Sequence, residues 1–274
     1  MKLSRHTEHS KQSRFHKNKH VEISFQSTKE YDVKDQIYQK VMGEVPAFAF
    51  DEEVTRVFPD MIERSVPGYQ ATLSAAAALA QRLATPHSKI YELGCSRGAA
   101  LLAIDRKLDP SLQVELVGVD CSEAMLKACQ KDLVDSKMLK NHLSLIQEDI
   151  RQVELKDASL IVLNFTLQFI PIQDRLDLLC RAKKALRPGG ALLLSEKIRL
   201  ADERIDTLCI DLHHEFKKSQ GYSELEIARK RDALVGVLVP EPIQAHKDRL
   251  SAAGFSASEV WYQAFNFCSL VALA

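Results

Sequence analysis

Several signatures are absent from this chain of 274 residues, and each absence excludes a class of protein. No apolar run approaches the 18 residues typical of a membrane-spanning helix, and the first 20 residues lack the apolar segment of a signal peptide. Basic and acidic residues are equal in number, 37 of each, so no net charge attracts the chain to nucleic acid or to anionic lipid. We therefore expect a soluble, cytoplasmic protein that binds neither directly.

The cysteines follow no metal or redox spacing. None of the six belongs to a CxxC pair, which favours reduced and mostly buried thiols; they are Cys95, Cys121, Cys129, Cys180, Cys209 and Cys268. Residues 1–20 hold six basic side chains against one acidic one, together with four histidines, but few apolar residues. Without nearby cysteine or apolar periodicity, a solvated leader is a better reading than a metal site. We expect a basic, disordered leader at 1–45, one domain at 46–274, and no metal.

The most informative feature that is present is a glycine loop between a strand and a helix. The apolar run 89–93 leads into Gly94, and Gly98 precedes a helical pattern at 98–108. Glycine permits backbone conformations and close ligand approach that other residues hinder. The spacing is GxxxG, and a dinucleotide site favours GxGxxG. The loop therefore suits an adenosyl ligand with an amino-acid tail, although an ordinary tight turn would give the same pattern.

An acidic residue ends the next predicted strand. Residues 114–120 form a second buried-strand pattern that finishes at Asp120, 26 residues after Gly94. A carboxylate in that place can accept hydrogen bonds from both ribose hydroxyls. Ser122 then resembles a helix N-cap, so Asp120 could instead support that cap. A third strand at 143–146 leads to Asp149, which we expect to accept from an adenine amino group, and to Ile150, which we expect against the ring.

The order of elements predicts an α/β fold. Strands at 89–93, 114–120, 143–146, 159–164 and 190–196 alternate with helices at 98–108, 122–134 and 171–187, and a turn at 187–190 starts the fifth strand. Such alternation is typical of parallel βαβ units. Two β-rich runs, 260–267 and 269–274, predict a terminal antiparallel pair. We expect a doubly wound, mostly parallel seven-stranded sheet with an antiparallel C-terminal strand, and a helical insertion at 200–253 that acts as a lid or a dimer arm.

Two further polar residues are candidates on weaker grounds. Asn164 ends an apolar strand where the reactive end of a ligand would lie, and its amide can donate and accept there. A turn asparagine that satisfies nearby backbone is an equally good reading. Arg231 lies in a charged helical stretch, where an arginine is most often solvated. The pattern of residues alone does not single it out.

Six motifs together resemble one family, the carboxy-S-adenosyl-L-methionine synthases. They are residues 57–62 (VFPDMI), 64–69 (RSVPGY), 91–96 (YELGCS), 164–169 (NFTLQF), 194–197 (LSEK) and 221–227 (GYSELEI), and the resemblance covers residues 48–274. It implies the Rossmann-like class I methyltransferase fold and a homodimer. It also implies conversion of S-adenosyl-L-methionine and prephenate to carboxy-S-adenosyl-L-methionine, phenylpyruvate and water. The product would then serve a partner enzyme that carboxymethylates the wobble uridine of tRNA.

The resemblance implies a set of ligand contacts. They fall on Tyr69, Gly94, Cys95, Ser96, Asp120, Cys121, Asp149, Ile150, Asn164 and Arg231. Among these, Arg231 offers a planar fork of donors for the added carboxylate. The chain departs from the family where Cys121 replaces a frequent asparagine and Glu92 an aspartate. The first change removes a side-chain amide near adenosine but leaves a backbone contact possible.

The implied reaction needs no side-chain nucleophile, because the sulfonium stabilises an adjacent carbanion that captures carbon dioxide. This agrees with the lack of an obvious Ser-His-Asp or Cys-His arrangement. His213 and His214 are adjacent on a predicted helix, so we expect at most one to reach a site, and we assign neither a role. Two other functions would use parts of the same pattern. They are a conventional S-adenosylmethionine-dependent methyltransferase and a non-catalytic nucleoside- or tRNA-associated binding protein.

Overall fold

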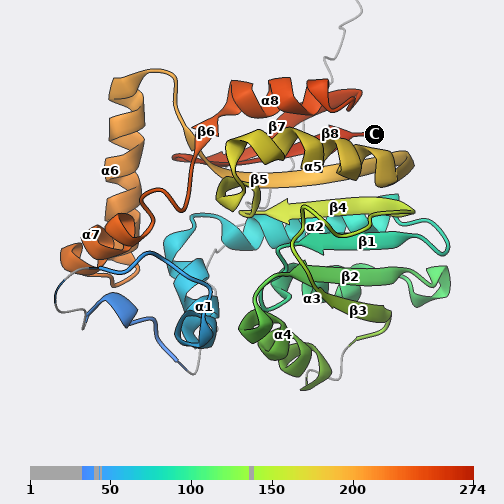
Figure 1. Ribbon diagram of the computed structural model, residues 1–274, viewed down its shortest axis with the longest axis horizontal. Coiled ribbons are helices and arrows are strands. Elements are labelled where there is room, and N and C mark those ends of the chain that lie inside the picture. Colours follow the sequence, from blue (N-terminus) through green and yellow to red (C-terminus); the bar gives the residue numbers. More distant parts are fainter. Residues whose placement is uncertain (1–32, 40–42, 44, 136–138) are drawn as a thin grey trace, which may run out of the picture. The chain divides into compact units, whose positions relative to one another are not determined.

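The computed structural model describes residues 33–39, 43, 45–135 and 139–274, and it contains a twisted mixed sheet (Figure 1). Seven strands follow the order β3-β2-β1-β4-β5-β8-β7, and the short β6 pairs with β5 outside this path. The strands are β1 (Lys89–Leu93), β2 (Glu115–Asp120), β3 (His142–Gln147), β4 (Ala158–Asn164), β5 (Leu186–Arg199), β6 (Glu241–Pro242), β7 (Ala257–Ala264) and β8 (Phe267–Leu273). The predicted doubly wound sheet is confirmed, with β6 as an unforeseen addition.

The direction of the strands places the site. Strands β1 to β5 pair in parallel, and β8 runs antiparallel to both β5 and β7. The order along the sheet reverses at β1, which lies between β2 and β4. In such sheets a crevice opens beyond the carboxyl ends of the strands at the reversal point. Gly94, Asp120 and Asn164 all stand at those ends.

Helices cover both faces of the sheet. Alternate strand residues point to opposite sides, so Ile90 and Leu160 belong to one apolar cluster while Tyr91 and Ile161 belong to the other. The first cluster packs under α2 and α3, and the second under α5 and α8. The helices are α1 (Glu52–Ser65), α2 (Tyr69–Leu83), α3 (Ala99–Lys107), α4 (Glu123–Asp135), α5 (Ile172–Ala185), α6 (Glu203–Ser219), α7 (Glu224–Ala233) and α8 (Ile243–Ala252); the 3-10 turns are η1 (Ile37–Gln39), η2 (Pro110–Leu112) and η3 (Leu167–Phe169).

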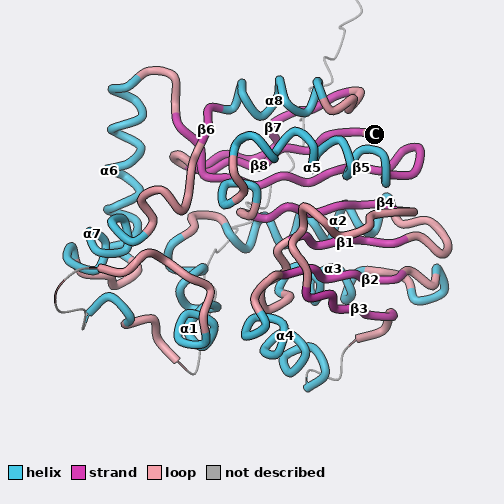
Figure 2. The backbone as a smooth tube through the Cα atoms, viewed as in Figure 1, coloured by secondary structure: helices cyan, strands magenta, loops and turns pink. Residues whose placement is uncertain are grey.

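The predicted insertion at 200–253 is too long at its C-terminal end. Leu250 of α8 is fully buried in the same cluster as Leu178 and Leu179 of α5, so α8 belongs to the layer over the sheet. Figure 2 shows α6 and α7 standing apart at the end of the sheet, while α8 lies beside α5. The excursion therefore consists of α6, α7 and the segment after α7. No helix in the described ranges is long and apolar enough to cross a membrane.

The predicted turn at 187–190 lies inside β5. The register of β4 with β5 jumps from Ala158↔Leu186 to Leu160↔Ala191, so these residues form an irregularity within the strand. Gly189 takes a φ of 79°, a left-handed conformation that glycine adopts readily. Glycine therefore allows the backbone to turn at these residues, as predicted. However, β5 pairs with β4 both before and after them.

The predicted leader also extends too far. Residues 33–39 contact the body: the backbone N–H of Asp35 donates to Asp60 at 2.7 Å, and the Tyr222 hydroxyl donates to the Asp35 carboxylate. Arg64 donates to the Asp35 carbonyl, and the Asp35 residue is only 1% exposed. The expectation of disorder is therefore wrong for residues 33–39, because Asp35 balances buried cations. The rest of it, at residues 1–32, 40–42 and 44, lies outside the described residues.

We predict that Asp35→Ala lowers the free energy of unfolding by about 1–3 kcal/mol, because the Tyr222 hydroxyl loses its buried acceptor. Urea denaturation of the full chain measures the change. Gln36→Ala is the matched control, since Gln36 is exposed one position away and should leave stability within about 0.5 kcal/mol of wild type. Equal stability of the two variants would contradict a structural role for Asp35.

Candidate active site

A cavity of about 740 Å³ lies beyond the carboxyl ends of β1, β2, β4 and β5 and is closed by residues of α1, α6, α7 and η3. It brings together most of the predicted site residues: Gly94, Ser96, Asp120, Cys121, Asp149, Ile150, Asn164 and Arg231. Tyr69 and Cys95 are not part of its lining. Tyr69 packs against the cluster of Val66, Phe165 and Phe267 behind the wall, and Cys95 is 2% exposed beneath the loop.

Packing within the chain requires the glycines of the loop. A Cβ on Gly94 would lie 2.4 Å from the Thr166 side chain, and Gly94 has a φ of 78°. A Cβ on Gly98 would lie 2.7 Å from Cys129 Sγ of α4, so the loop lies close to that helix. The loop is therefore held to β4 and α4 before any ligand binds.

Glu92, where the family more often has aspartate, has a structural role. Its buried carboxylate accepts from the backbone N–H of Leu101 at 3.2 Å, in the first turn of α3. Burial raises the pKa of Glu92 well above its ordinary value. The side chain is absent from the lining of the cavity and braces the helix behind the glycine loop.

Asp120 connects the glycine loop to α4. One carboxylate oxygen accepts from the Ser96 N–H at 2.8 Å, and the other accepts from the Ser122 N–H at 2.9 Å. Burial raises the pKa of Asp120, and these two backbone donors oppose that rise. Each oxygen keeps a lone pair for a ligand hydroxyl. The sequence predicted either a ribose acceptor or a support for the next helix. The two roles are compatible, because the Asp120 carboxylate supports the start of α4 and still lines the cavity.

We predict that Asp120→Asn weakens binding of an adenosyl ligand by about 1.5–3 kcal/mol, the usual contribution of hydrogen bonds to a charged group. Asparagine keeps one oxygen for the loop, whereas alanine would leave the Ser96 and Ser122 N–H groups without an acceptor. Calorimetric titration with S-adenosyl-L-methionine gives the affinity, and thermal unfolding checks the fold. Unchanged affinity in a folded variant would remove Asp120 from the ribose site.

The expected adenine contacts lie in a loop that Arg151 and Arg181 hold to α5. Arg151 binds the Asp149 carboxylate through Nε at 3.0 Å and also pairs with Asp174 at 2.7 Å. Hydrogen bonding to Arg151 lowers the pKa of Asp149. Arg181 donates to the backbone carbonyls of the same loop. Asp149 would therefore have to share its carboxylate between Arg151 and an adenine amino group, while Ile150 is free to lie against the ring.

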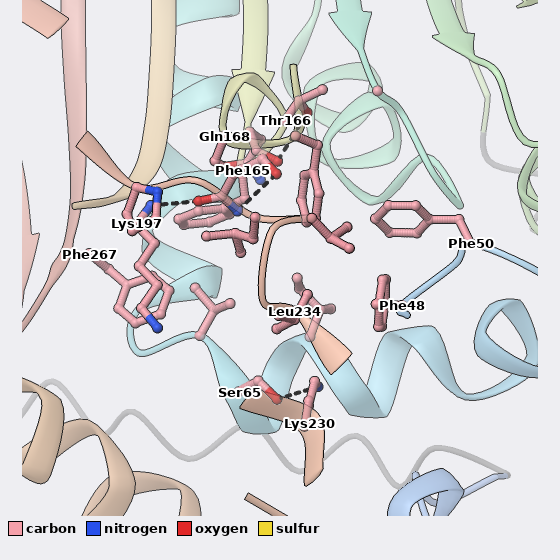
Figure 3. A pocket seen from close by; sticks show the side chains of 18 of the residues that line it. Phe48, Phe50, Ser65, Phe165, Thr166, Gln168, Lys197, Lys230, Leu234 and Phe267 are labelled. Atoms are coloured by element: carbon pink, nitrogen blue, oxygen red, sulfur yellow. Dashed lines mark hydrogen bonds between the residues drawn. The ribbon is translucent and has the colours of Figure 1, made fainter. Parts of the chain in front are cut away.

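The middle of the cavity is aromatic, and no motif in the sequence predicted this. Phe48, Phe50, Phe58, Phe165 and Phe169 line it, and Figure 3 shows the Phe48 and Phe50 side chains facing it from the segment before α1. Asn164 also lines the cavity, and its Oδ1 is buried without a partner among the described residues. An unsatisfied acceptor in a cavity is suited to a ligand donor such as an ammonium group.

The far end of the cavity is cationic. Lys197, Arg199, Lys217, Lys230, Arg231, His213 and His214 line it, with Asp206 as an acidic neighbour. Burial, followed by the charges of Lys230 and Lys197, lowers the pKa of Lys217 to about 7. The lysines of α6 and α7 were missed because a basic residue in a charged helical stretch normally faces solvent.

Both adjacent histidines line the cavity, so the expectation that at most one would reach it is wrong. His213 is 6% exposed and its Nε2 lies 2.8 Å from the Ser65 carbonyl, which fixes Nε2 as the protonated nitrogen. Burial lowers the pKa of His213 to about 3, so the ring is neutral. His214 is half-buried beside it, with 6.3 Å between the ring centroids.

Arg231 reaches the cavity but already has a carboxylate partner. Its guanidinium binds Asp232 at 3.2 Å, and its side chain is 63% exposed. A carboxylated ligand that uses the Nε and Nη2 donors would have to replace Asp232. Across the described ranges, no cluster of three or more His, Cys, Asp or Glu side chains is arranged to hold a metal ion.

Comparison with known proteins agrees with this geometry. Residues 90–190 match a methyltransferase domain family. Carboxy-S-adenosyl-L-methionine synthase of Actinobacillus pleuropneumoniae serotype 5b (strain L20) is 47% identical over 240 residues, which is 88% of this chain and 99% of that protein. The synthase of Aliivibrio fischeri (strain ATCC 700601 / ES114) is 47% identical over 239 residues, 87% of this chain and 98% of that protein.

Solved structures share the fold at low identity. Human N-acetylserotonin methyltransferase in complex with SAM superposes with a TM-score of 0.53 at 14% identity, covering 81% of this chain and 55% of that chain. Magnesium protoporphyrin IX methyltransferase of Synechocystis PCC 6803 with bound SAH gives 0.52 at 14% identity, covering 75% and 82%. With the class I methyltransferase fold and the near full-length similarity together, the chain belongs to the carboxy-S-adenosyl-L-methionine synthase family.

Proposed function

We propose that this chain converts S-adenosyl-L-methionine and prephenate into carboxy-S-adenosyl-L-methionine, phenylpyruvate and water. The observation that supports it is the division of one cavity of about 740 Å³ into two unlike ends. Asp120 and Asp149 stand at one end, where a nucleoside offers hydroxyl and amino donors. Lys197, Lys217 and Lys230 stand at the other, where an anionic donor such as prephenate is favoured.

The chain's contribution to this reaction is binding, orientation and exclusion of water. The donor loses carbon dioxide and hydroxide as its ring becomes aromatic. The hydroxide takes a proton from the sulfonium methyl group and leaves as water, and the resulting carbanion attacks the carbon dioxide. Solvent would protonate the carbanion, so the aromatic wall that includes Phe48, Phe50 and Phe165 serves to keep water away.

The polar residues of the site have separate parts in this proposal. Asp120 orients the ribose, and the buried, unpaired Oδ1 of Asn164 accepts from the ammonium group of the amino-acid tail. Arg231 binds the new carboxylate after release from Asp232. No side chain is required as a nucleophile.

The test is to mix purified protein with S-adenosyl-L-methionine and prephenate and to identify the products by mass. The proposal expects phenylpyruvate together with a sulfonium heavier than the substrate by one carboxyl group. The small molecule released on denaturing the protein should be the same species. S-adenosylhomocysteine and a methylated acceptor in their place would establish a conventional methyltransferase. Absence of turnover with tight ligand binding would favour a binding protein.

We further propose that the protein acts in the cytoplasm as a homodimer and supplies a tRNA wobble-uridine carboxymethyltransferase. The outer side of α6 supports the dimer, because Ile205, Leu208 and Leu212 are 53%, 55% and 41% exposed at helical spacing. A second copy would cover this apolar stripe. Light scattering should give a dimer for the wild type and a monomer for Leu208→Glu, and a dimeric Leu208→Glu would place the interface elsewhere.

A further inference from the structure

Two lysines from distant parts of the chain meet at the cationic end of the cavity. Lys197 comes from the end of β5 and Lys217 from the inner side of α6. Lys197 Nζ lies 5.8 Å from the centroid of the Phe267 ring, and Lys217 Nζ lies 5.6 Å from that of Tyr222. Figure 3 shows Lys197 beside Phe267, and the Lys217 residue is 6% exposed. Their surroundings are therefore aromatic and largely dry.

Within the described part of the chain, neither ammonium group forms an ion pair or a side-chain hydrogen bond. Lys230 provides the contrast on the same cavity. Its Nζ donates to Ser65 Oγ at 2.9 Å and lies 4.0 Å from an Asp35 carboxylate oxygen (Figure 3). The fold thus supplies partners for one buried lysine and leaves the other two facing the cavity without them.

Two buried ammonium groups without an opposite charge beside them raise the free energy of the folded protein. Burial lowers the pKa of Lys197, and burial together with Lys230 and Lys197 lowers that of Lys217 to about 7. A buried charge without a partner costs free energy, and an opposite charge that enters the site recovers it. An anion in the cavity would stabilise both protonated amines at once.

We infer that Lys197 and Lys217 form a binding subsite for the carboxylates of the donor, separate from Arg231. The inference rests on the proposed function, in which the donor carries two carboxylates. Two ammonium groups match a dianion in number. Arg231, which lies toward solvent and is paired with Asp232, is then left for the carboxylate of the product.

Calorimetric titration with prephenate tests the subsite. Lys217→Met and Lys197→Met keep most of the apolar stem and remove the charge, so each should weaken donor binding roughly 10- to 100-fold, as for the loss of a hydrogen bond to a charged group. S-adenosyl-L-methionine affinity should be unchanged. Lys218→Met is the control, because Lys218 is the next residue of α6 and its ion pairs with Glu215 and Glu224 lie outside the cavity. Lys217→Arg should restore part of the loss.

Proton uptake gives a second measurement that loss of structure would not imitate. At pH 8 the Lys217 amine is largely neutral in the free protein, and it must be protonated to pair with a carboxylate. Donor binding should therefore take up protons at pH 8, and its affinity should fall as the pH rises above 7. The charged and titratable groups near this amine are Lys197 on β5, Lys230 and Glu226 on α7, Asp35 before α1, Tyr222 between α6 and α7, and His213 and His214 on α6. Titration in buffers of different ionisation enthalpy measures the uptake, which should largely disappear in Lys217→Met.

The outcomes separate the subsite from the proposed function. If wild type turns over prephenate while both methionine variants bind it as wild type does, the subsite is wrong and the function stands. If wild type does not bind prephenate but binds another dicarboxylate through these lysines, the subsite stands and the donor is misassigned. Proton uptake that persists at the wild-type level in Lys217→Met would assign the uptake to another group and remove Lys217 from the subsite.

Discussion

Replacement of Arg231 by alanine is expected to weaken binding of carboxy-S-adenosyl-L-methionine by about 2–5 kcal/mol, because the ligand's carboxylate loses a bidentate partner. S-adenosyl-L-methionine has no such carboxylate and should lose much less. The arginine side chain is 63% exposed, so screening by solvent favours the lower half of that range. The measurement is the pair of dissociation constants for the two ligands in wild type and variant.

The neighbouring acid supplies a matched control. Asp232 holds the guanidinium in the empty site, so Asp232→Ala should leave Arg231 free and tighten the carboxylated ligand slightly. Arg231→Lys should rescue only part of the loss, since a point charge cannot reproduce the planar fork. Equal losses for both ligands in Arg231→Ala would show that the residue supports the fold or the adenosyl site, and that another group binds the carboxylate.

The adenosyl end of the site was predictable from sequence because it follows a local rule. Gly94, Asp120 and Asn164 each end a buried strand, and the carboxyl ends of parallel strands meet at one edge of a sheet. Strand identity and order along the chain are therefore enough to bring these residues together. Their distances and partners, such as the two N–H groups that Asp120 binds, follow from the turn geometry and were not predicted.

The cationic end was not predictable by the same means. Lys217 is buried because α6 packs one side against α1 and α7, and the apolar pattern of α6 places Leu208 and Leu212 on the other, exposed side. Hydrophobic periodicity normally predicts that the apolar side of a helix faces the core and that its lysines face solvent. In α6 the apolar Leu208 and Leu212 are exposed and Lys217 is buried, so that rule gives the wrong orientation. Similarly, Asp35 looked like part of a polar leader until Tyr222 and Asp60 were found beside it.

One buried arginine of α5 bonds to the segment that follows α7. Arg175 of α5 is fully buried and donates to the carbonyls of Ile170 at 2.9 Å and Val239 at 3.0 Å. Its guanidinium also pairs with Glu241 of β6, which Arg249 of α8 contacts at 2.7 Å. These bonds join η3 to the segment after α7, and Val237, Leu238 and Pro240 of that segment line the cavity.

We therefore predict that Arg175→Met lowers the free energy of unfolding by about 3–5 kcal/mol, because Glu241 loses a buried partner and the carbonyls of Gln168, Ile170 and Val239 lose this donor. Urea denaturation measures it. Arg204→Met removes an ion pair whose arginine is 89% exposed and should cost at most about 1 kcal/mol. The donor's KM should rise in Arg175→Met under conditions where the protein is still folded, since the wall at 235–240 is no longer held to α5. A variant with wild-type stability would show that β6 and α8 hold this segment without Arg175, and a destabilised variant with unchanged KM would show that the wall keeps its place without that anchor.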